Sequence, residues 1–294
     1  MSKISDSEFL KKYDSSSFFK PSVSSDAIVF TIRDIKTDNY RKLPEKKLQV
    51  LLVKRGENPF IDKWSIPGVF IQEKENFEGS VKRCLDEKAN ISDIYLEQLY
   101  TWGSPKRDPR TRVISVSHMG LINSDNIDLK PGKNVEDIAW FTINTEILKE
   151  EKEEIEDGYK ITEEVCLTLE NEKTVLKSVL NVIKEYRRNN EIIYTNIISS
   201  DLAFDHPKML IYAIERLKNK VEYTTIAFNL MPKEFTLTKL QQVYEILLDK
   251  KLLKANFRRK ISEMVIETEH YDENQGHRPS KLFRFNTEYR QQYF

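Results

Sequence analysis

The chain has 294 residues, with 47 basic and 47 acidic side chains and 39% hydrophobic residues. This length predicts two domains or one large one, and the apolar content excludes disorder throughout the chain. No apolar run reaches the roughly 18 residues of a membrane helix, and residues 1–12 lack a signal-peptide core, so neither a membrane protein nor an exported one is expected. The two cysteines, Cys84 and Cys166, have neither zinc-site nor disulfide spacing, which favours the cytoplasm.

The balanced total charge conceals a difference between the two parts of the chain. Residues 207–294 carry 16 basic and 11 acidic side chains, whereas residues 1–206 carry 31 and 36. The C-terminal part is therefore better suited to bind a polyanion. The acidic run at residues 149–157 is expected to be a solvated helix end or linker.

The first 145 residues alternate predicted strands with helices. Residues 77, 81, 85 and 89 are apolar at i+4 spacing and predict an amphipathic helix at 76–89, which Asn90 is expected to end in a left-handed conformation. A second helix is expected late in this part. Short β-branched runs predict strands at residues 26–32, 48–54, 96–102, 112–122 and 137–141. This pattern predicts an α+β sandwich for residues 1–145.

The next segment, residues 146–204, is interpreted as a connector or elaboration. We expect a charged helix at its start, a strand at 165–169, a helix around 175–186 and a further strand at 192–197. Their packing partners cannot be identified from the apolar spacing.

Residues 205–294 show the pattern of a winged helix. Asp205 is expected to cap a first helix, and Thr238 with Gln241 forms a capping-box pattern for a second. A third helix is predicted at 254–264, followed by strands at 264–269 and 281–285. Three helices followed by a β-ribbon are typical of this fold.

The segment 69–91 resembles a Nudix box, in which a helix carries carboxylates that hold Mg²⁺ against a substrate pyrophosphate. The residues that match the pattern or replace its metal ligands are Glu75, Arg83, Cys84, Glu87 and Lys88. A thiol at Cys84 suits Mg²⁺ poorly, and Lys88 places a positive charge where a ligand is needed. We therefore expect no catalytic residues, no bound metal and no required cofactor, with Arg83 paired to Glu75. An unusual metal site built from Glu73, Glu75 and Asp86 stays open.

Residues 100–116 are similar to a stretch of Nudix proteins that act on or bind ADP-ribose-like ligands. Arg107, Arg110 and Arg112 lie close together in sequence, and guanidinium groups suit phosphate oxygens. Phe70 or Trp102 could stack on a base or sugar face. These five residues are the predicted ligand site. Alternatively, Arg107 pairs locally with Asp108, and Trp102 belongs to the core.

The runs at 201–206, 222–232, 234–245, 256–261 and 277–285 together look like the C-terminal module of the Nudix-related transcriptional regulators of the NrtR type. The resemblance covers about residues 20–145 and 201–285. It implies an N-terminal Nudix-like α/β/α sandwich that senses a metabolite and a C-terminal winged helix-turn-helix domain that binds operator DNA.

The predicted DNA-binding residues lie on the third helix and on the wing. Phe257 and Ile261, four residues apart, should instead anchor the third helix in the core. The alternative for Arg258 and Arg259 is a solvated basic face. The predicted set comprises Asn256, Arg258, Arg259, Lys260, His277, Arg278 and Lys281.

We therefore expect a homodimeric repressor whose Nudix-like domain binds a small effector such as ADP-ribose, another nucleoside diphosphate compound or a sugar. Its second partner is a pseudo-palindromic operator. One alternative is an atypical Nudix hydrolase of ADP-ribose-like nucleoside diphosphates. A third hypothesis is an adaptor that uses the winged helix for protein contacts.

Overall fold

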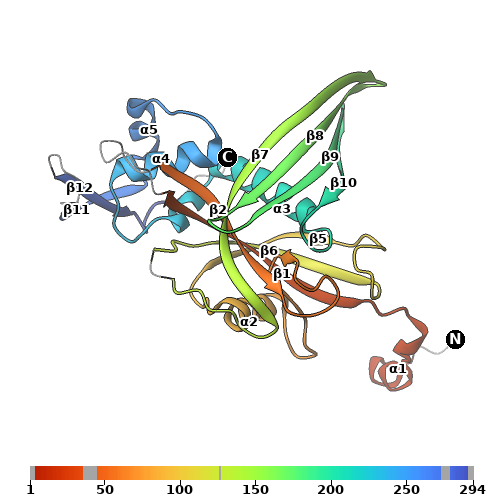
Figure 1. Cartoon of the computed structure of the whole chain (residues 1–294). Helices are drawn as coiled ribbons and strands as arrows, with labels where there is room; N and C mark the ends of the chain where they lie inside the picture. Colours follow the sequence, from red (N-terminus) through yellow and green to blue (C-terminus); the bar gives the residue numbers. More distant parts are fainter. Residues whose placement is uncertain (1–3, 36–44, 126, 273–278, 291–294) are drawn as a thin grey trace.

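The computed structural model describes residues 4–35, 45–125, 127–272 and 279–290. One large curved sheet forms the body of the protein, and a smaller helical unit with a two-stranded ribbon lies at one end (Figure 1). The strands are β1 (Ser22–Ile35), β2 (Glu45–Arg55), β3 (Trp64–Ser65), β4 (Gly68–Phe70), β5 (Tyr95–Trp102), β6 (Val113–Leu121), β7 (Val135–Ile155), β8 (Gly158–Glu170), β9 (Val175–Arg187), β10 (Asn190–Ser200), β11 (Val265–Asp272) and β12 (Ser280–Phe285). The helices are α1 (Asp6–Lys12), η1 (Ser15–Ser17), α2 (Phe77–Ala89), α3 (His206–Tyr223), η2 (Ile226–Leu230), α4 (Leu237–Leu248) and α5 (Lys254–Ile261).

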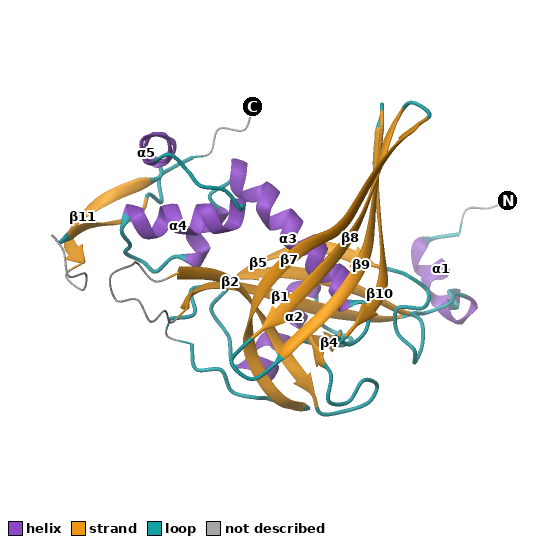
Figure 2. Cartoon of the chain, turned by 45° about the horizontal axis from the view of Figure 1, so that its top comes forward, coloured by secondary structure: helices purple, strands orange, loops and turns teal. Residues whose placement is uncertain are grey.

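The large sheet has the strand order β10-β9-β8-β7-β2-β1-β6-β5, with β3 added to β2 and β4 added to β1. β1 runs parallel to β6 and antiparallel to β2, so the centre of the sheet is mixed. From β7 to β10 the strands form antiparallel hairpins whose far ends project beyond the body (Figure 2).

Helices cover both faces of this sheet. The alternation of side chains along β1 places Ala27 and Val29 against α2, and it places Ile28 and Phe30 in the core on the opposite face. That opposite core includes Met209 and Leu217 of α3. The α/β/α arrangement expected for the N-terminal part is therefore confirmed, with α3 as its second layer of helix.

Strands toward the two opposite edges of the curved sheet, β9 and β5, both contact α3. On one side, Lys184 of β9 lies 3.7 Å from the Glu215 carboxylate of α3. On the other side, the rings of Tyr100 in β5 and Tyr212 in α3 are 5.1 Å apart between centroids. The middle of α3 is consequently held by the sheet on two sides, and the helix also packs on α4 of the smaller unit.

The smaller unit has the helices and ribbon of a winged helix. Tyr244 of α4 packs against Phe257 of α5 with ring centroids 5.4 Å apart, and Phe257 and Ile261 are buried as expected. The expected capping box is wrong, because α4 begins earlier and Thr236 accepts a hydrogen bond from the backbone of Lys239. In the described part of the chain, no helix is long and apolar enough to cross a membrane.

The helices expected at the start of 146–204 and around 175–186 are wrong, because both stretches are strands. β7 and β8 are joined by a two-residue turn at 156–157, with Ile155 opposite Gly158 and Asp157 at a φ of 61°. In β9 the buried residues alternate through Leu176, Ser178, Leu180 and Val182, which is the period of a strand. The segment therefore extends the sheet, and the late helix expected before residue 145 is not found among the described residues between α2 and β7.

Close packing against the C-terminal end of α2 leaves no room for a side chain at residue 132. A Cβ atom at Gly132 would lie 1.7 Å from the carbonyl oxygen of Glu87, near the C-terminal end of α2. Replacing Gly132 by alanine is expected to lower the free energy of unfolding by about 1–3 kcal/mol, because the backbone must move apart. Urea unfolding would measure the loss, with Gly103→Ala as the control, since the nearest atom there is 3.9 Å away. Equal stability of the two variants would contradict the prediction.

Candidate functional site

A cavity of about 330 Å³ lies where β4, α2, the loop before β6 and the start of α3 meet. Its lining combines aromatic rings with many charged groups that converge on one space. The cationic side chains are Arg55, Arg83, Lys88, Arg107, Arg110 and Lys133, and the acidic ones are Asp26, Glu57, Glu87 and Asp108. Cationic groups outnumber acidic ones, so the cavity favours an anionic ligand.

A larger hollow of about 750 Å³ lies between β2, β7, α3 and α4. Four of its lysines form ion pairs with carboxylates at 3.0 Å or less. These lysines are Lys46, Lys47, Lys250 and Lys251. The smaller cavity is the better candidate ligand site, because it combines aromatic rings with converging guanidinium groups.

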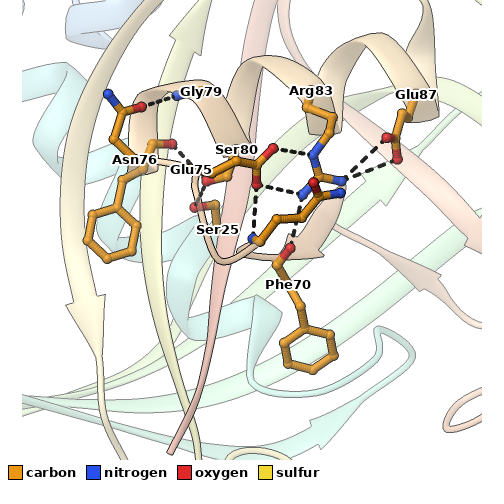
Figure 3. A network of polar contacts seen from close by, with 10 residues as sticks. Ser25, Phe70, Glu75, Asn76, Gly79, Ser80, Arg83 and Glu87 are labelled. Atoms are coloured by element: carbon orange, nitrogen blue, oxygen red, sulfur yellow. Dashed lines mark hydrogen bonds and ion pairs between the residues drawn. The ribbon is translucent and has the colours of Figure 1, made fainter.

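Arg83 organises the Nudix-like helix on one side of the cavity (Figure 3). Its Nε and Nη2 donate to the Glu75 carboxylate at 2.6 and 2.9 Å, and its Nη2 also donates to the Phe70 carbonyl at 3.0 Å. The pKa of Glu75 is lowered chiefly by this hydrogen bonding from Arg83. Glu87 lies 3.4 Å from the same guanidinium. The pair expected between Glu75 and Arg83 is therefore present, and it ties the loop to the helix.

The residues that replace the Nudix metal ligands do not fit Mg²⁺. Cys84 is fully buried, and burial raises the pKa of its thiol. Lys88 Nζ donates to the carbonyl of Lys133 at 2.9 Å, which places an ammonium group on the cavity side of the helix. Within the described ranges, no group of three or more His, Cys, Asp or Glu side chains is placed to hold a metal ion.

Arg107 lines the cavity but is almost completely covered by its neighbours, with only 5% of its side chain exposed. Its Nε and Nη2 donate to the Asp205 carboxylate at 3.1 and 2.8 Å, and Nη2 lies 4.0 Å from Asp26. Burial raises the pKa of Asp26 to about 6, opposed by Arg107 and by a hydrogen bond from Ser115. The local pair expected between Arg107 and Asp108 is not the dominant contact, because Arg107 reaches the residue before α3.

Arg110 and two phenylalanine rings form one cluster in the cavity lining. The Arg110 guanidinium lies 5.2 Å from the centroid of Phe70 and 5.9 Å from that of Phe204, and Asp108 holds it in a bidentate pair. The Arg55 guanidinium also lies beside this cluster, 5.0 Å from the centroid of the Phe204 ring. Phe70 is 44% exposed, so a flat ligand group can reach it.

Two of the predicted ligand residues lie outside the cavity lining. Trp102 donates from Nε1 to the Ser117 hydroxyl at 2.9 Å and packs against Tyr100 and Tyr212, so the alternative that it belongs to the core agrees with its position. Arg112 donates to the Gly103 carbonyl at 2.5 Å and stabilises the loop.

Sequence reasoning missed Arg55, Phe204 and His206 as cavity residues. The resemblance assigns the run 201–206 to the C-terminal module, together with the winged helix. Only the fold places it beside β3, where the Ala203 N–H donates to the Trp64 carbonyl at 2.9 Å. His206 is 4% exposed, and its Nδ1 accepts a hydrogen bond from the backbone N–H of Ile66 at 2.9 Å.

The buried His206 makes stability depend on pH. Burial, with Arg107 and Arg55, lowers its pKa to about 3, whereas an unfolded histidine has a pKa of about 6.5. Its contribution is therefore complete above pH 6.5 and is lost as the pH falls. From pH 7 to 5 the wild type is expected to lose about 2 kcal/mol more than His206→Asn, in which the amide oxygen can still accept from Ile66. Urea unfolding at several pH values measures this, and equal losses in the wild type and the variant would contradict the prediction.

The predicted DNA-binding residues do not all point the same way. Asn256, Arg258 and Arg259 are exposed on α5. Lys260 is exposed too, but its Nζ donates to the Glu222 carbonyl at the end of α3, at 3.0 Å, and partial burial lowers its pKa. Lys281 on β12 lies 4.8 Å from the centroid of the Tyr271 ring. His277 and Arg278 lie outside the described residues.

The whole chain resembles a characterised regulator. It is 30% identical over 284 residues to the ADPR-responsive transcriptional repressor NtrR of Acinetobacter baylyi, which covers 96% of this chain and 88% of the relative. The chain belongs to the NrtR family. Residues 227–285 match the NrtR DNA-binding winged helix domain, and residues 42–165 match the NUDIX domain.

Two further relatives agree with this NrtR-type organisation. The crystal structure of Shewanella oneidensis NrtR complexed with a 27mer DNA is 26% identical, with a TM-score of 0.60 and coverage of 90% of this chain and 93% of that one. The ADP-ribose pyrophosphatase of Methanocaldococcus jannaschii is 30% identical over 135 residues, which cover 46% of this chain and 69% of the enzyme. The NrtR-type chain therefore joins a domain related to hydrolases to a DNA-binding domain.

Proposed function

We propose that this chain is a transcriptional repressor that binds operator DNA through α5 and binds ADP-ribose in the 330 Å³ cavity. The observation that carries the proposal is the 30% identity to an ADPR-responsive repressor over 96% of the chain. The exposed Asn256, Arg258 and Arg259 support DNA contact at the helix that a winged helix places in the major groove. A cytoplasmic location follows from this function.

The charges of the cavity favour a ligand that carries phosphate over a neutral sugar. Arg55 and Arg110 lie beside aromatic rings, so a diphosphate and a base can both find partners there. Lys88 and Lys133 add positive charge from the α2 side. ADP-ribose contains both a diphosphate and a base, which makes it the effector we propose.

We also propose that the repressor acts as a homodimer on a pseudo-palindromic operator. One winged helix reads few base pairs, and a second copy doubles the contact with DNA. Exposed apolar side chains in α1 and directly after η1, including Phe9, Phe18 and Phe19, offer surface for a second copy. Sedimentation of the protein with and without operator would measure the stoichiometry.

The decisive experiment selects operator sequences and then tests the effector. The purified chain is incubated with random DNA duplexes at near-physiological salt, and the bound fraction is sequenced. A motif with two-fold symmetry supports the proposal, and release of that motif by ADP-ribose identifies the effector. Failure to enrich any motif, together with Mg²⁺-dependent cleavage of ADP-ribose, would support the hydrolase instead.

Binding of ADP-ribose is expected to be independent of divalent cations, because Cys84 and Lys88 leave Mg²⁺ without a ligand set. In titration calorimetry, EDTA should change the affinity by less than about twofold, whereas metal-dependent binding would weaken more than about tenfold. When the protein and ADP-ribose are incubated with added Mg²⁺ and the products are separated by chromatography, no AMP should form. Formation of AMP in proportion to the enzyme concentration would contradict the expectation.

A further inference from the structure

The segment that precedes α3 is a wall of the cavity and also the start of the helix that packs on the winged helix. Phe204 and His206 both line the cavity, and α3 begins at His206. Phe204 adopts a left-handed backbone with a φ of 54°, and its ring packs against Phe60 with centroids 4.7 Å apart. The cavity and α3 therefore share residues.

Polar contacts fix the N-terminal end of α3 to the Nudix-like domain. Asp205 stands at the N-cap position of α3, but its side chain makes no capping hydrogen bond. Its carboxylate instead accepts from both Nε and Nη2 of Arg107. His206 accepts from the backbone of Ile66. Since Arg107 lines the cavity, an anionic ligand that enters competes with Asp205 for the same guanidinium.

The C-terminal end of α3 is bonded to the helices of the winged helix. The Glu222 carboxylate accepts from Lys250, in the turn after α4, at 3.0 Å. The Glu222 carbonyl accepts from Lys260 of α5, also at 3.0 Å. One continuous helix thus contacts the cavity at one end and the DNA-facing helix at the other.

We propose that α3 couples the two sites: Phe204 contacts the bound effector, Asp205 and Arg107 set the position of α3, and Glu222 passes its movement to α5 through Lys260. This inference rests on the proposed function and names how that function is regulated. An effector changes DNA affinity only by binding two arrangements of the protein with different affinity. Competition for Arg107 supplies such a difference, because the Asp205 pair is intact in one arrangement and weakened in the other.

The test measures the coupling factor, defined as the operator Kd at saturating ADP-ribose divided by the operator Kd without it. Asp205→Asn and Lys260→Gln are each expected to bring this factor about tenfold closer to one. Lys260 lies on the surface, so its variant keeps the test valid if Asp205→Asn fails to fold, which circular dichroism would show. Asp201→Asn is the control, because Asp201 accepts from the backbone of Lys177 outside the cavity.

The contact of Phe204 with the effector is tested separately by calorimetry. Phe204→Leu is expected to weaken ADP-ribose binding about tenfold, whereas Phe60→Leu, which changes the packing behind the ring, should cost less than about threefold. Equal losses in the two variants would overturn the contact. Wild-type coupling in both Asp205→Asn and Lys260→Gln would overturn the route through α3. If the wild type binds neither operator nor ADP-ribose, the proposed function itself fails.

Discussion

Replacing Arg258 and Arg259 together by alanine is expected to weaken operator binding by about 100-fold or more, since each contact to a base or phosphate contributes about 1–3 kcal/mol. Both side chains are exposed on α5, and the buried Phe257 and Ile261 hold the opposite side of the helix in the core. The affinity for ADP-ribose should be retained, because neither arginine lines the cavity. Fluorescence anisotropy with labelled operator measures the loss.

The salt dependence of binding separates phosphate contacts from base contacts. A lost phosphate contact lowers the slope of log K against log salt concentration by about one, whereas a lost base contact relaxes the sequence preference. The control is Arg187→Ala with Arg188→Ala, which removes the same charge at the far end of β9. An unchanged affinity and slope in the α5 double variant would show that DNA is read elsewhere.

Replacing Arg107 by methionine is expected to lower the free energy of unfolding by about 3–5 kcal/mol, because it leaves buried carboxylates without their cationic partner. Asp205 loses both of its hydrogen bonds from the guanidinium, and Asp26 loses its nearby charge. Arg112→Met is the matched control, since Arg112 donates to the Gly103 carbonyl of an exposed loop, and its cost should be about 1 kcal/mol.

The loss in Arg107→Met should also depend on pH. The folded pKa of Asp26 is raised to about 6, so its protonated form is favoured in the fold, and stability falls as the pH rises through that value. Without Arg107, which opposes this rise, the pKa of Asp26 increases further. The difference between wild type and variant should therefore be larger at pH 8 than at pH 5 in urea unfolding. A difference that is constant with pH would show that Asp26 is not part of the cluster.

Local sequence patterns predicted the elements whose partners are close by or whose pattern is unambiguous. The i+4 spacing predicted α2, which spans Phe77–Ala89, and Asn90 ends it at a φ of 55° as expected. The β-branched run 26–32 predicted the centre of β1, whose residues are buried on both faces of the sheet. In such segments, helix or strand propensity agrees with the final packing.

The strands at 137–141 and 165–169 are parts of β7 and β8 as expected, but the long extension of β7 and the strand β9 do not follow from the local pattern, which is ambiguous without the fold. Val175, Val179 and Ile183 satisfy a helical spacing as well as a strand spacing, and the charged residues of 149–156 favour helix when considered alone. Long antiparallel pairing decides the outcome, with Glu150 opposite Glu163 and Glu154 opposite Tyr159. The Asp157-Gly158 pair, a strong hairpin signal, was the available evidence for this pairing.

The cavity was predicted in part, because motifs identify residues but not the neighbours that reach them from elsewhere in the chain. Phe70 and Arg110 were expected and lie together. Arg107 was expected to be open, yet Asp205 pairs with it from 98 positions later in the sequence. Long-range pairing of this kind depends on where α3 crosses the sheet, which no local pattern specifies.

Because α3 is long, a small rotation at its cavity end produces a larger displacement at its other end. Its 18 residues span about 27 Å, so a rotation of about 5° at the cavity end displaces the other end by about 2 Å. Hydrogen bonds to base edges tolerate less than that, and both winged helices of a dimer must fit their half-sites at once. A change too small to alter the sheet at the cavity can thus be large enough to misalign two reading helices on DNA.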